Sequence, residues 1–248
     1  FIPDFSEFTY ETLLAALGQM FYSMSLAMGI MITYGSYMKK DAKISGAARQ
    51  ISICDTAFAI VAATIIIPSI YAFSPDPQSA VASSGPSLMF VQLPAVFNNL
   101  PGGRWIGALF FVLVFFAALT SSISLVETIV AILRENCHLK RWVACAIVFG
   151  FSLLLGSLSS LGFGPLSMVQ IGGKGILDMF DWVSNSVIMP LVAIGTCIIA
   201  GFFSDVGSIM DEVGMKSKAF RTYFLIMIRF VGPLCMAAIL ISGIFMTL

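Results

Sequence analysis

The stretch that decides the fold is Leu14–Met38, LAALGQMFYSMSLAMGIMITYGSYM, which contains no charged residue. About twenty apolar residues, each rising about 1.5 Å, match a hydrocarbon core of about 30 Å, so the stretch can cross a bilayer as a helix. Polar and small residues nevertheless cluster at its centre, namely Gln19, Tyr22, Ser23, Ser25 and then Ala27-Met28-Gly29. They favour either a helix–helix packing face or a helix that breaks around a solute, because unwound backbone in a membrane survives only where it lines a protein cavity. On this stretch alone both interpretations stay open.

The composition of the whole chain is that of a polytopic membrane protein. Of the 248 residues, 58% are hydrophobic and 10% are charged, whereas soluble domains carry about 25% charged residues. The net charge is zero and no basic block is present, so a nucleic acid is not expected as a partner. The five cysteines form no CxxC pair, and the one histidine, His138, lies in a basic turn. This pattern argues against a metal framework and against a membrane-embedded enzyme.

Six apolar spans, all too long for strands, predict six membrane helices in a single transmembrane domain covering residues 1–248. Their approximate bounds are 14–38, 49–74, 105–133, 141–161, 179–203 and 220–247. Ten Lys and Arg residues follow the first, third and fifth spans, whereas the loops on the other side contain only Arg104 and Lys174. The positive-inside rule therefore predicts a multi-pass protein of the plasma (bacterial inner) membrane with residue 1 on the external side. The opening FIPDFSEFTYET has the composition of an internal loop, so we expect the C-terminal part of a longer protein.

The two glycine- and proline-containing external loops carry different signals. The first, about 75–104, contains a partly apolar segment at 87–98 that predicts a short helical element. This loop can dip back as a lid or form a compact surface loop, and the sequence does not separate the two. The second, 161–177, contains Gly-Gly-Lys-Gly but lacks the spacing and the preceding strand of a phosphate-binding loop.

Few ionisable or hydroxyl residues lie inside the spans, so each is informative. Asp55 lies in the second span and Glu127 in the third, where a charged group costs roughly 3 kcal/mol or more. Asp55 predicts a nearby cation, unless water near the inner surface solvates it. Thr120-Ser121-Ser122 in the third span either bond back to their own carbonyls or, with a carbonyl from the preceding turn, offer hard oxygen ligands to a small cation. An oxygen-rich, partly anionic site at mid-membrane suits Na⁺.

Two motifs together resemble one known family. GQMFYSMSLAMGIMITYGSYM (18–38) is similar to the sixth transmembrane helix of the neurotransmitter:sodium symporters, and FFAALTSS (115–122) is similar to the eighth, particularly in bacterial sodium-dependent amino-acid transporters. The resemblance runs from Pro3 to the end of the chain. It implies an all-α integral membrane protein that holds the second inverted repeat of the five-plus-five helix symporter fold plus one further helix, that is, helices six to eleven. Helices one to five would be missing partners outside this sequence.

The resemblance implies a sodium-coupled secondary transporter rather than an enzyme. It would carry amino acids or related small zwitterions across the lipid bilayer by alternating access. A channel or a structural membrane subunit without sodium-coupled uptake is the alternative. The residues implied around the substrate are Tyr22, Ser23, Ser25, Met28, Ser121 and Leu125.

Two sodium sites are implied as well, both completed by the missing N-terminal helices. The first would use Ser23 and Asp55, and the second would use the carbonyl of Ala117 with the hydroxyls of Thr120 and Ser121.

Gate residues follow from the same resemblance. Tyr22 would also cap the substrate from outside, and Asp181 would be the outer-gate carboxylate that pairs with an arginine on a missing helix. Glu135 and Tyr37 would be the acid and the aromatic residue of the inner gate. Glu127 would face the inner pathway without a definite role.

Two positions depart from the family pattern. Asp55 stands where many members have Asn, and Gln19 matches a residue of the chloride and outer-gate region. The carboxylate of Asp55 would replace the anion, so chloride would not be required.

Ala27 stands where the family often has Gly, and a methyl group that points to the pocket would favour small or medium aliphatic substrates by about 1–3 kcal/mol. If the methyl group points away, Met28 would adapt to whatever is bound.

Overall fold

The computed structural model describes residues 8–39, 42–74, 77–78, 88–170 and 172–245. The elements within these ranges are helices, and five helical segments are long and apolar enough to cross a membrane. They are Ile44–Phe73, Gly103–Cys137, Arg141–Leu161, Ile176–Phe203 and Lys218–Phe245. They correspond to the second to sixth predicted spans, which confirms the all-α membrane fold. The predicted external position of residue 1 and much of the first half of the loop at 75–104 lie outside the described residues.

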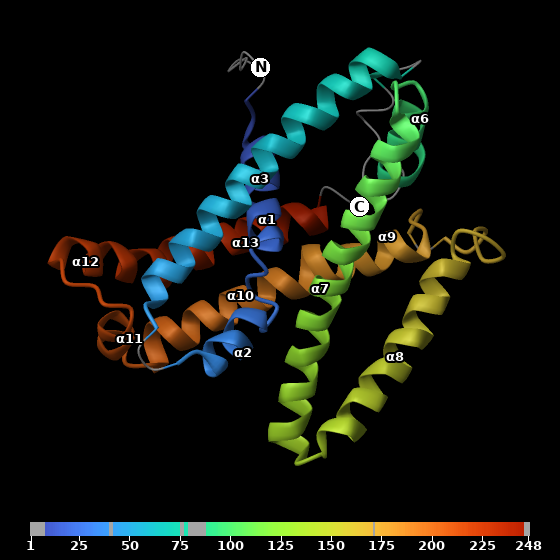
Figure 1. Cartoon of the computed structure of the whole chain (residues 1–248). Coiled ribbons are helices and arrows are strands. Elements are labelled where there is room, and N and C mark those ends of the chain that lie inside the picture. The colour runs from blue at the N-terminus through green and yellow to red at the C-terminus, as the bar shows by residue number, and fades with distance from the viewer. Residues whose placement is uncertain (1–7, 40–41, 75–76, 79–87, 171, 246–248) are drawn as a thin grey trace. The chain divides into compact units, whose positions relative to one another are not determined.

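The chain divides into two compact units, which are described separately. Unit 1 comprises Phe1–Ala48 and Leu125–Leu248, and unit 2 comprises Arg49–Ser124. The helix α7 (Gly103–Cys137) runs through the boundary, so its first part belongs to unit 2 and its last part to unit 1. Figure 1 shows the order of the helices along the chain.

The first predicted span consists of two short helices with a break between them (Figure 1). α1 covers Tyr10–Ser23, and the side chain of Thr9 accepts a hydrogen bond from the Thr12 amide at its start. α2 covers Ile30–Tyr37. Ser25, Ala27 and Gly29, with φ of 53°, 62° and 75°, adopt the left-handed conformation between them. A right-handed helix cannot continue through such residues, so of the two interpretations left open for this stretch the structure confirms the helix break.

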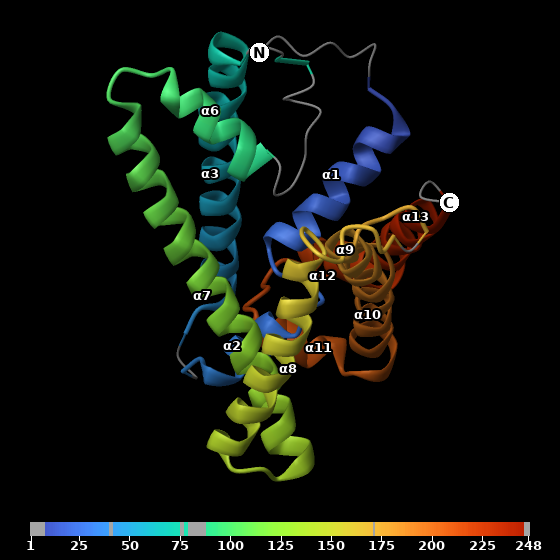
Figure 2. The same cartoon turned by 90° about the vertical axis from the view of Figure 1, so that its right-hand side faces the viewer.

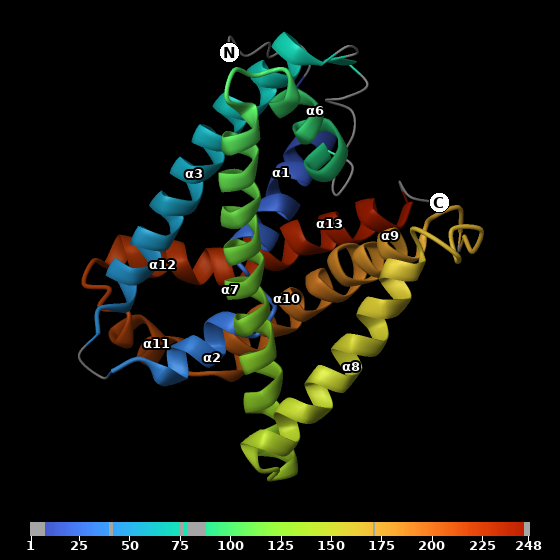
Figure 3. The ribbon, with the colours of Figure 1, turned by 45° about the vertical axis from the view of Figure 1, so that its right-hand side comes forward.

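In unit 1, α8 (Arg141–Leu161) turns back beside the C-terminal end of α7, as Figures 2 and 3 both show. The turn contains His138, whose φ of 53° ends the helical path. The interface is a small apolar cluster in which Val130, Ala144 and Val148 are buried. Their burial fixes the rotation of the last turns of α7, because a helix buries one stripe of its surface.

The last two spans of unit 1 lie side by side. The first comprises α9 (Ile176–Asp181), the π-helix η3 (Trp182–Ile188), α10 (Met189–Ile198) and the π-helix η4 (Ile199–Phe203). The second comprises α12 (Lys218–Ile226), the π-helix η5 (Met227–Val231) and α13 (Gly232–Phe245). Figures 1 and 3 show α13 running along α10.

Polar and close contacts join these two spans. Near one end, Trp182 Nε1 donates a 2.9 Å hydrogen bond to the carbonyl of Gly243, and a Cβ at Gly243 would approach Ser186 to 2.7 Å. Further along the pair, Arg229 Nε donates a 2.6 Å hydrogen bond to the Gly201 carbonyl. Small residues therefore let the backbones approach closely, as is common between membrane helices.

Unit 2 contains α3 (Ile44–Phe73) from Arg49 onward, the short helices η2 (Leu88–Gln92) and α6 (Leu93–Asn98), and α7 up to Ser124 (Figure 2). The helical element predicted at 87–98 is therefore confirmed. Ile70 of α3 and Val96 of α6 are buried together, each 1% exposed. Asn99 Nδ2 donates to the carbonyl of Phe73 at 3.2 Å, which fixes this short helix to the end of α3.

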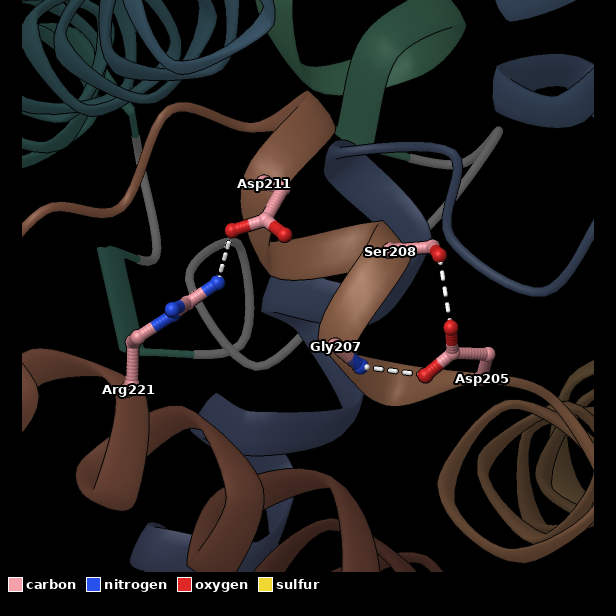
Figure 4. A network of polar contacts seen from close by, with 5 residues as sticks. All are labelled: Asp205, Gly207, Ser208, Asp211 and Arg221. Carbon is pink, nitrogen blue, oxygen red and sulfur yellow. Dashed lines mark hydrogen bonds and ion pairs between the residues drawn. The ribbon is translucent and has the colours of Figure 1, made fainter.

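A short helix, α11 (Val206–Glu212), lies between the last two spans of unit 1. Asp205 caps its start by accepting hydrogen bonds from the Gly207 amide at 3.0 Å and from Ser208 Oγ at 2.6 Å. At its other end, Asp211 accepts a hydrogen bond from Arg221 of α12 and forms an ion pair with it (Figure 4). Local charges and caps thus hold a helix too short to be stable alone.

Candidate functional site

The helix break is the centre of the candidate site in unit 1. Its hydrogen bonds are turns: the Ser25 amide donates to the Tyr22 carbonyl and the Leu26 amide to the Phe21 carbonyl, both at 3.0 Å. The amide of Met24 likewise donates to the Met20 carbonyl at 3.1 Å, so amides of the break bond to three of the last four carbonyls of α1. The dipoles of the two helices direct partial charges of opposite sign at the break. A zwitterion has the two charged groups that such a pair of ends binds.

The substrate residues expected on the first span lie at or beside this break. Tyr22 and Ser23 end α1, and Ser25 and Met28 lie within the non-helical segment. Leu125, on α7 in the same unit, is 44% exposed. The structure thus places five of the six expected substrate residues in unit 1, and Ser121 belongs to unit 2.

A cavity of about 520 Å³ lies between α1, the segment α9–α10 and α13. It brings the predicted residue Asp181 together with Gln19 and Tyr22, which are far from it in the sequence. Asn185, which the sequence reasoning missed, also lines it and donates a 2.6 Å hydrogen bond from Nδ2 to Asp181 Oδ1. The spacing of four residues on one helix is a signal that could have identified Asn185.

A second polar cluster joins three helices of unit 1. Tyr37, at the end of α2, donates a 2.8 Å hydrogen bond to Oε1 of Glu127 on α7. Arg141, at the start of α8, donates to Oε2 of the same carboxylate at 2.6 Å. The Glu127 side chain is 19% exposed and the Arg141 side chain 60% exposed. The sequence marked Glu127 as an intramembrane carboxylate, but no spacing linked it to Tyr37.

Glu135, the predicted inner-gate acid, lies two turns further along α7 and is exposed. Its backbone carbonyl contacts Nδ1 of His138 at 3.0 Å. His138 therefore serves the turn that ends α7.

In unit 2, the predicted sodium ligands of α7 form a compact group of oxygens. Thr120 Oγ1 donates a 2.9 Å hydrogen bond to the Ala117 carbonyl, and Ser122 Oγ donates to the Leu119 carbonyl at 2.8 Å. These are the back-bonds that the sequence left as an alternative to ion binding. They also bring the Thr120 hydroxyl and the Ala117 carbonyl together, and both oxygens retain lone pairs for a cation. Ser121 is exposed beside them, and Asp55 is partly buried in α3 of the same unit.

These observations define a class before any comparison is made: a multi-pass helical membrane protein whose first apolar stretch is broken into two short helices, with a cavity beside the first of them. The chain belongs to the Sodium:neurotransmitter symporter family, whose model matches residues 1–247.

Relatives of the chain carry matching descriptions. It is 33% identical to a sodium-dependent transporter of Haemophilus influenzae and 32% identical to the sodium-dependent transporter YhdH of Bacillus subtilis, over 98% and 97% of its length. The solved structure of MhsT in complex with L-phenylalanine is similar over 98% of the chain, with 35% identity and a TM-score of 0.87. The chain spans about half the length of the relatives it matches: 52% and 53% of the two transporters and 54% of MhsT.

Proposed function

We propose that this chain forms part of a sodium-coupled symporter that moves amino acids or related small zwitterions by alternating access. The observation that carries the proposal is the helix break at Met24–Gly29. The C-terminal end of α1 and the N-terminal end of α2 meet at this break. The family membership supports coupling to sodium. The similarity to MhsT, a structure solved with L-phenylalanine, supports an amino acid as the substrate.

The substrate would bind at the break. Its carboxylate would face the N-terminal amides of α2 and its ammonium group the C-terminal carbonyls of α1, because the helix dipoles favour these signs. Tyr22 would cover the substrate from outside, and Ser23, Ser25, Met28, Leu125 and Ser121 would line the rest of the site. Ala27 in the left-handed conformation would favour small or medium aliphatic side chains.

Two sodium ions would travel with the substrate. One would bind the Ala117 carbonyl with the hydroxyls of Thr120 and Ser121, and the 2.9 Å contact between Thr120 Oγ1 and the Ala117 oxygen supports this set. The other would bind Ser23 and Asp55. Oxygen atoms of these kinds are the ligands that a hard cation prefers. Both sites would be completed by N-terminal helices outside this chain.

Asp55 would also supply the negative charge that chloride provides elsewhere in the family, so transport would not require chloride. Gln19 would belong to the same chloride and outer-gate region. It lines a cavity together with Asp181. Asp181 would belong to the outer gate, and Glu135 and Tyr37 to the inner gate. The excess of basic residues beside α2, α7 and α12 supports a cytoplasmic position for the inner gate in the plasma membrane, with residue 1 outside.

The test uses the full-length protein and measures amino-acid binding with and without Na⁺. Thr120→Ala combined with Ser121→Ala should abolish sodium-dependent binding, because it removes two of the three proposed oxygen ligands on α7. Ser122→Ala is the matched control: it removes the neighbouring hydroxyl, which bonds to the Leu119 carbonyl, and should leave the sodium dependence intact. Unchanged sodium dependence in the double variant would overturn this sodium site, and a wild-type protein without sodium-stimulated binding would overturn the symporter proposal.

A further inference from the structure

We propose that Thr128 of α7 is a positioning residue for the helix break, acting through the glycine that restarts the helix. Gly29 precedes the first residue of α2 and has φ of 75°. A Cβ at this position would lie 3.0 Å from Cγ2 of Thr128. The methyl group of Thr128 thus occupies the space beside Gly29 that a side chain would need. The inference rests on the proposed function, in which the amides at the start of α2 bind the substrate.

Burial shows that this contact is part of a packed surface. Thr128 is 3% exposed, and Ile30 and Thr33 of α2 are 6% and 8% exposed. Other residues of α2, among them Ile32 at 70% exposed and Tyr34 at 43%, are far more open. The start of α2 is therefore held on one face, next to the break, whereas much of the rest of this short helix is exposed.

A second contact reaches the neighbouring residue of α7. Tyr37, four residues after the buried Thr33 and on the same face of α2, bonds to Glu127. Thr128 at the beginning of α2 and Glu127 at its end thus hold the half-helix at two points. Tyr37 is 57% exposed and its contact is polar, whereas the Gly29 contact is apolar and buried. The buried contact sets the position of the amides more strictly, because packed interiors do not yield to changes of a methyl group.

The residue type at position 128 suits this task. A β-branched side chain on a helix has few χ1 rotamers, so its methyl group points in a defined direction. Thr128 is consequently a rigid spacer between α7 and the start of α2. Removing the methyl group should let α2 shift toward α7 and move the amides away from the proposed substrate carboxylate.

The experiment compares two single substitutions in the full-length protein. Thr128→Ser removes the methyl group and keeps the hydroxyl, whereas Thr128→Val keeps a methyl group and removes the hydroxyl. We expect Thr128→Ser to weaken sodium-dependent amino-acid binding about fourfold, the equivalent of one buried methyl group. Thr128→Val keeps the methyl group and loses only the buried hydroxyl, so it should weaken binding less than Thr128→Ser does. Equal affinity of the wild type and Thr128→Ser would overturn the proposal.

A double-substitution cycle tests the contact itself. Gly29→Ala should weaken binding more than about tenfold, because it adds both a clash and a strained conformation. In the double variant, Thr128→Ser should remove the clash and so restore the part of the binding affinity that the clash costs. The effects of the two substitutions on the binding free energy should therefore not be additive. Strictly additive effects would contradict a direct contact. If Gly29→Ala fails to fold, the comparison of Thr128→Ser with Thr128→Val decides alone.

Val130→Ala is the structural control on the same helix. Val130 is 1% exposed and packs with Ala144 and Val148 of α8, so its loss should lower the thermal stability and leave the affinity unchanged. An equal loss of affinity in Val130→Ala and Thr128→Ser would show a general packing effect and overturn the positioning role. A wild-type protein that binds no amino acid with sodium would instead overturn the proposed function on which this inference rests.

Discussion

The phenolic hydroxyl of Tyr37 donates a hydrogen bond of 2.8 Å to Oε1 of Glu127, 90 residues further along the chain. The other oxygen of the same carboxylate accepts from Arg141 at 2.6 Å. One carboxylate therefore links the end of α2 to α7 and to the start of α8. If Tyr37 belongs to the inner gate, as we propose, this link holds the gate closed.

Tyr37→Phe keeps the ring and removes the bond to Glu127. We expect bound amino acid to be released faster, by at most about fivefold, because exposed polar contacts contribute little. The measurement is the dissociation rate of a radiolabelled amino acid in the presence of Na⁺. Tyr71→Phe, at a tyrosine of α3 that is 57% exposed, is the control and should release at the wild-type rate. An unchanged rate in Tyr37→Phe would exclude this bond as a latch.

Ala27→Gly tests the size of the substrate pocket. Ala27 has φ of 62°, a conformation that costs a residue with a Cβ about 1–2 kcal/mol and glycine much less. The substitution should therefore fold at least as well. Competition binding should show an affinity for phenylalanine, relative to alanine or leucine, that rises about tenfold, since one or two methylenes of space become available. The same selectivity in both proteins would mean that the methyl group points away from the substrate.

Asp55→Asn tests charge compensation. Removing the carboxylate should create a requirement for an anion, so that transport by the variant rises when chloride is added while the wild type is indifferent to it. Uptake in gluconate buffer with increasing chloride measures this. Glu135→Gln, which also neutralises an acid of a membrane helix, is the control and should not become chloride-dependent. A large loss of wild-type uptake in chloride-free buffer would refute the proposed role of Asp55.

Gly103→Ala tests the packing of unit 2. A Cβ at Gly103 would clash with the carbonyl oxygen of Phe97, which is a backbone atom rather than the end of a flexible side chain. We expect a loss of about 3 kcal/mol or more, seen as a lower thermal denaturation midpoint in detergent. Gly150→Ala is the matched control, because nothing lies within 4 Å of its added Cβ, and it should leave the stability unchanged or raise it by up to about 1 kcal/mol. Similar stability of the two variants would contradict the packing described here.

The carboxylate of Asp205 predicts an acid-sensitive cap of α11. The hydroxyl of Ser208 and the backbone amides of Gly207 and Ser208 hold the pKa of Asp205 below its ordinary value of 3.8. Because the folded-state pKa is the lower one, the stabilisation is complete at neutral pH. It is lost as the pH falls from the ordinary value through the folded-state value.

Asp205→Asn should keep the cap through its side-chain oxygen and lose this pH dependence, whereas Asp205→Ala should lose the cap at every pH. Limited proteolysis between Ser204 and Met215 measures both effects. An acid-active protease is used below the ordinary pKa of the carboxyl, and a neutral protease is used at about pH 7, within the range where stability is usually greatest. Identical cleavage of the wild type and Asp205→Ala at neutral pH would show that Asp205 does not cap α11.

Much of the fold could be predicted from the sequence, because membrane helices are encoded locally. Hydropathy and length located the spans that became α3, α7 and α8 to within a few residues, since a helix in lipid satisfies its own backbone. The small and polar residues at the centre of the first span left a packing face and a helix break open, and the left-handed conformation of Ser25, Ala27 and Gly29 decided for the break. The hydrogen bond from Asn185 to Asp181 was missed, although the spacing of four residues could have indicated it.

The proposed sodium ligands and substrate residues stay predictions drawn from the resemblance. The structure adds that Thr120 and Ala117 lie close enough to act together, and that Gln19, Tyr22 and Asp181 line one cavity.

The sequence by itself determined that this is a helical membrane protein whose first apolar span has a polar centre, because apolar length and residue type are properties of neighbouring residues. Only the tertiary structure decided that Glu127 joins Tyr37 to Arg141 and that Thr128 fills the space beside Gly29. The contacts of α2 with Glu127 and Thr128 join residues about 90 to 100 positions apart, and the existence of all these contacts depends on how whole helices pack. A side chain that looks unassigned in the sequence acquires its role only when another helix is placed against it.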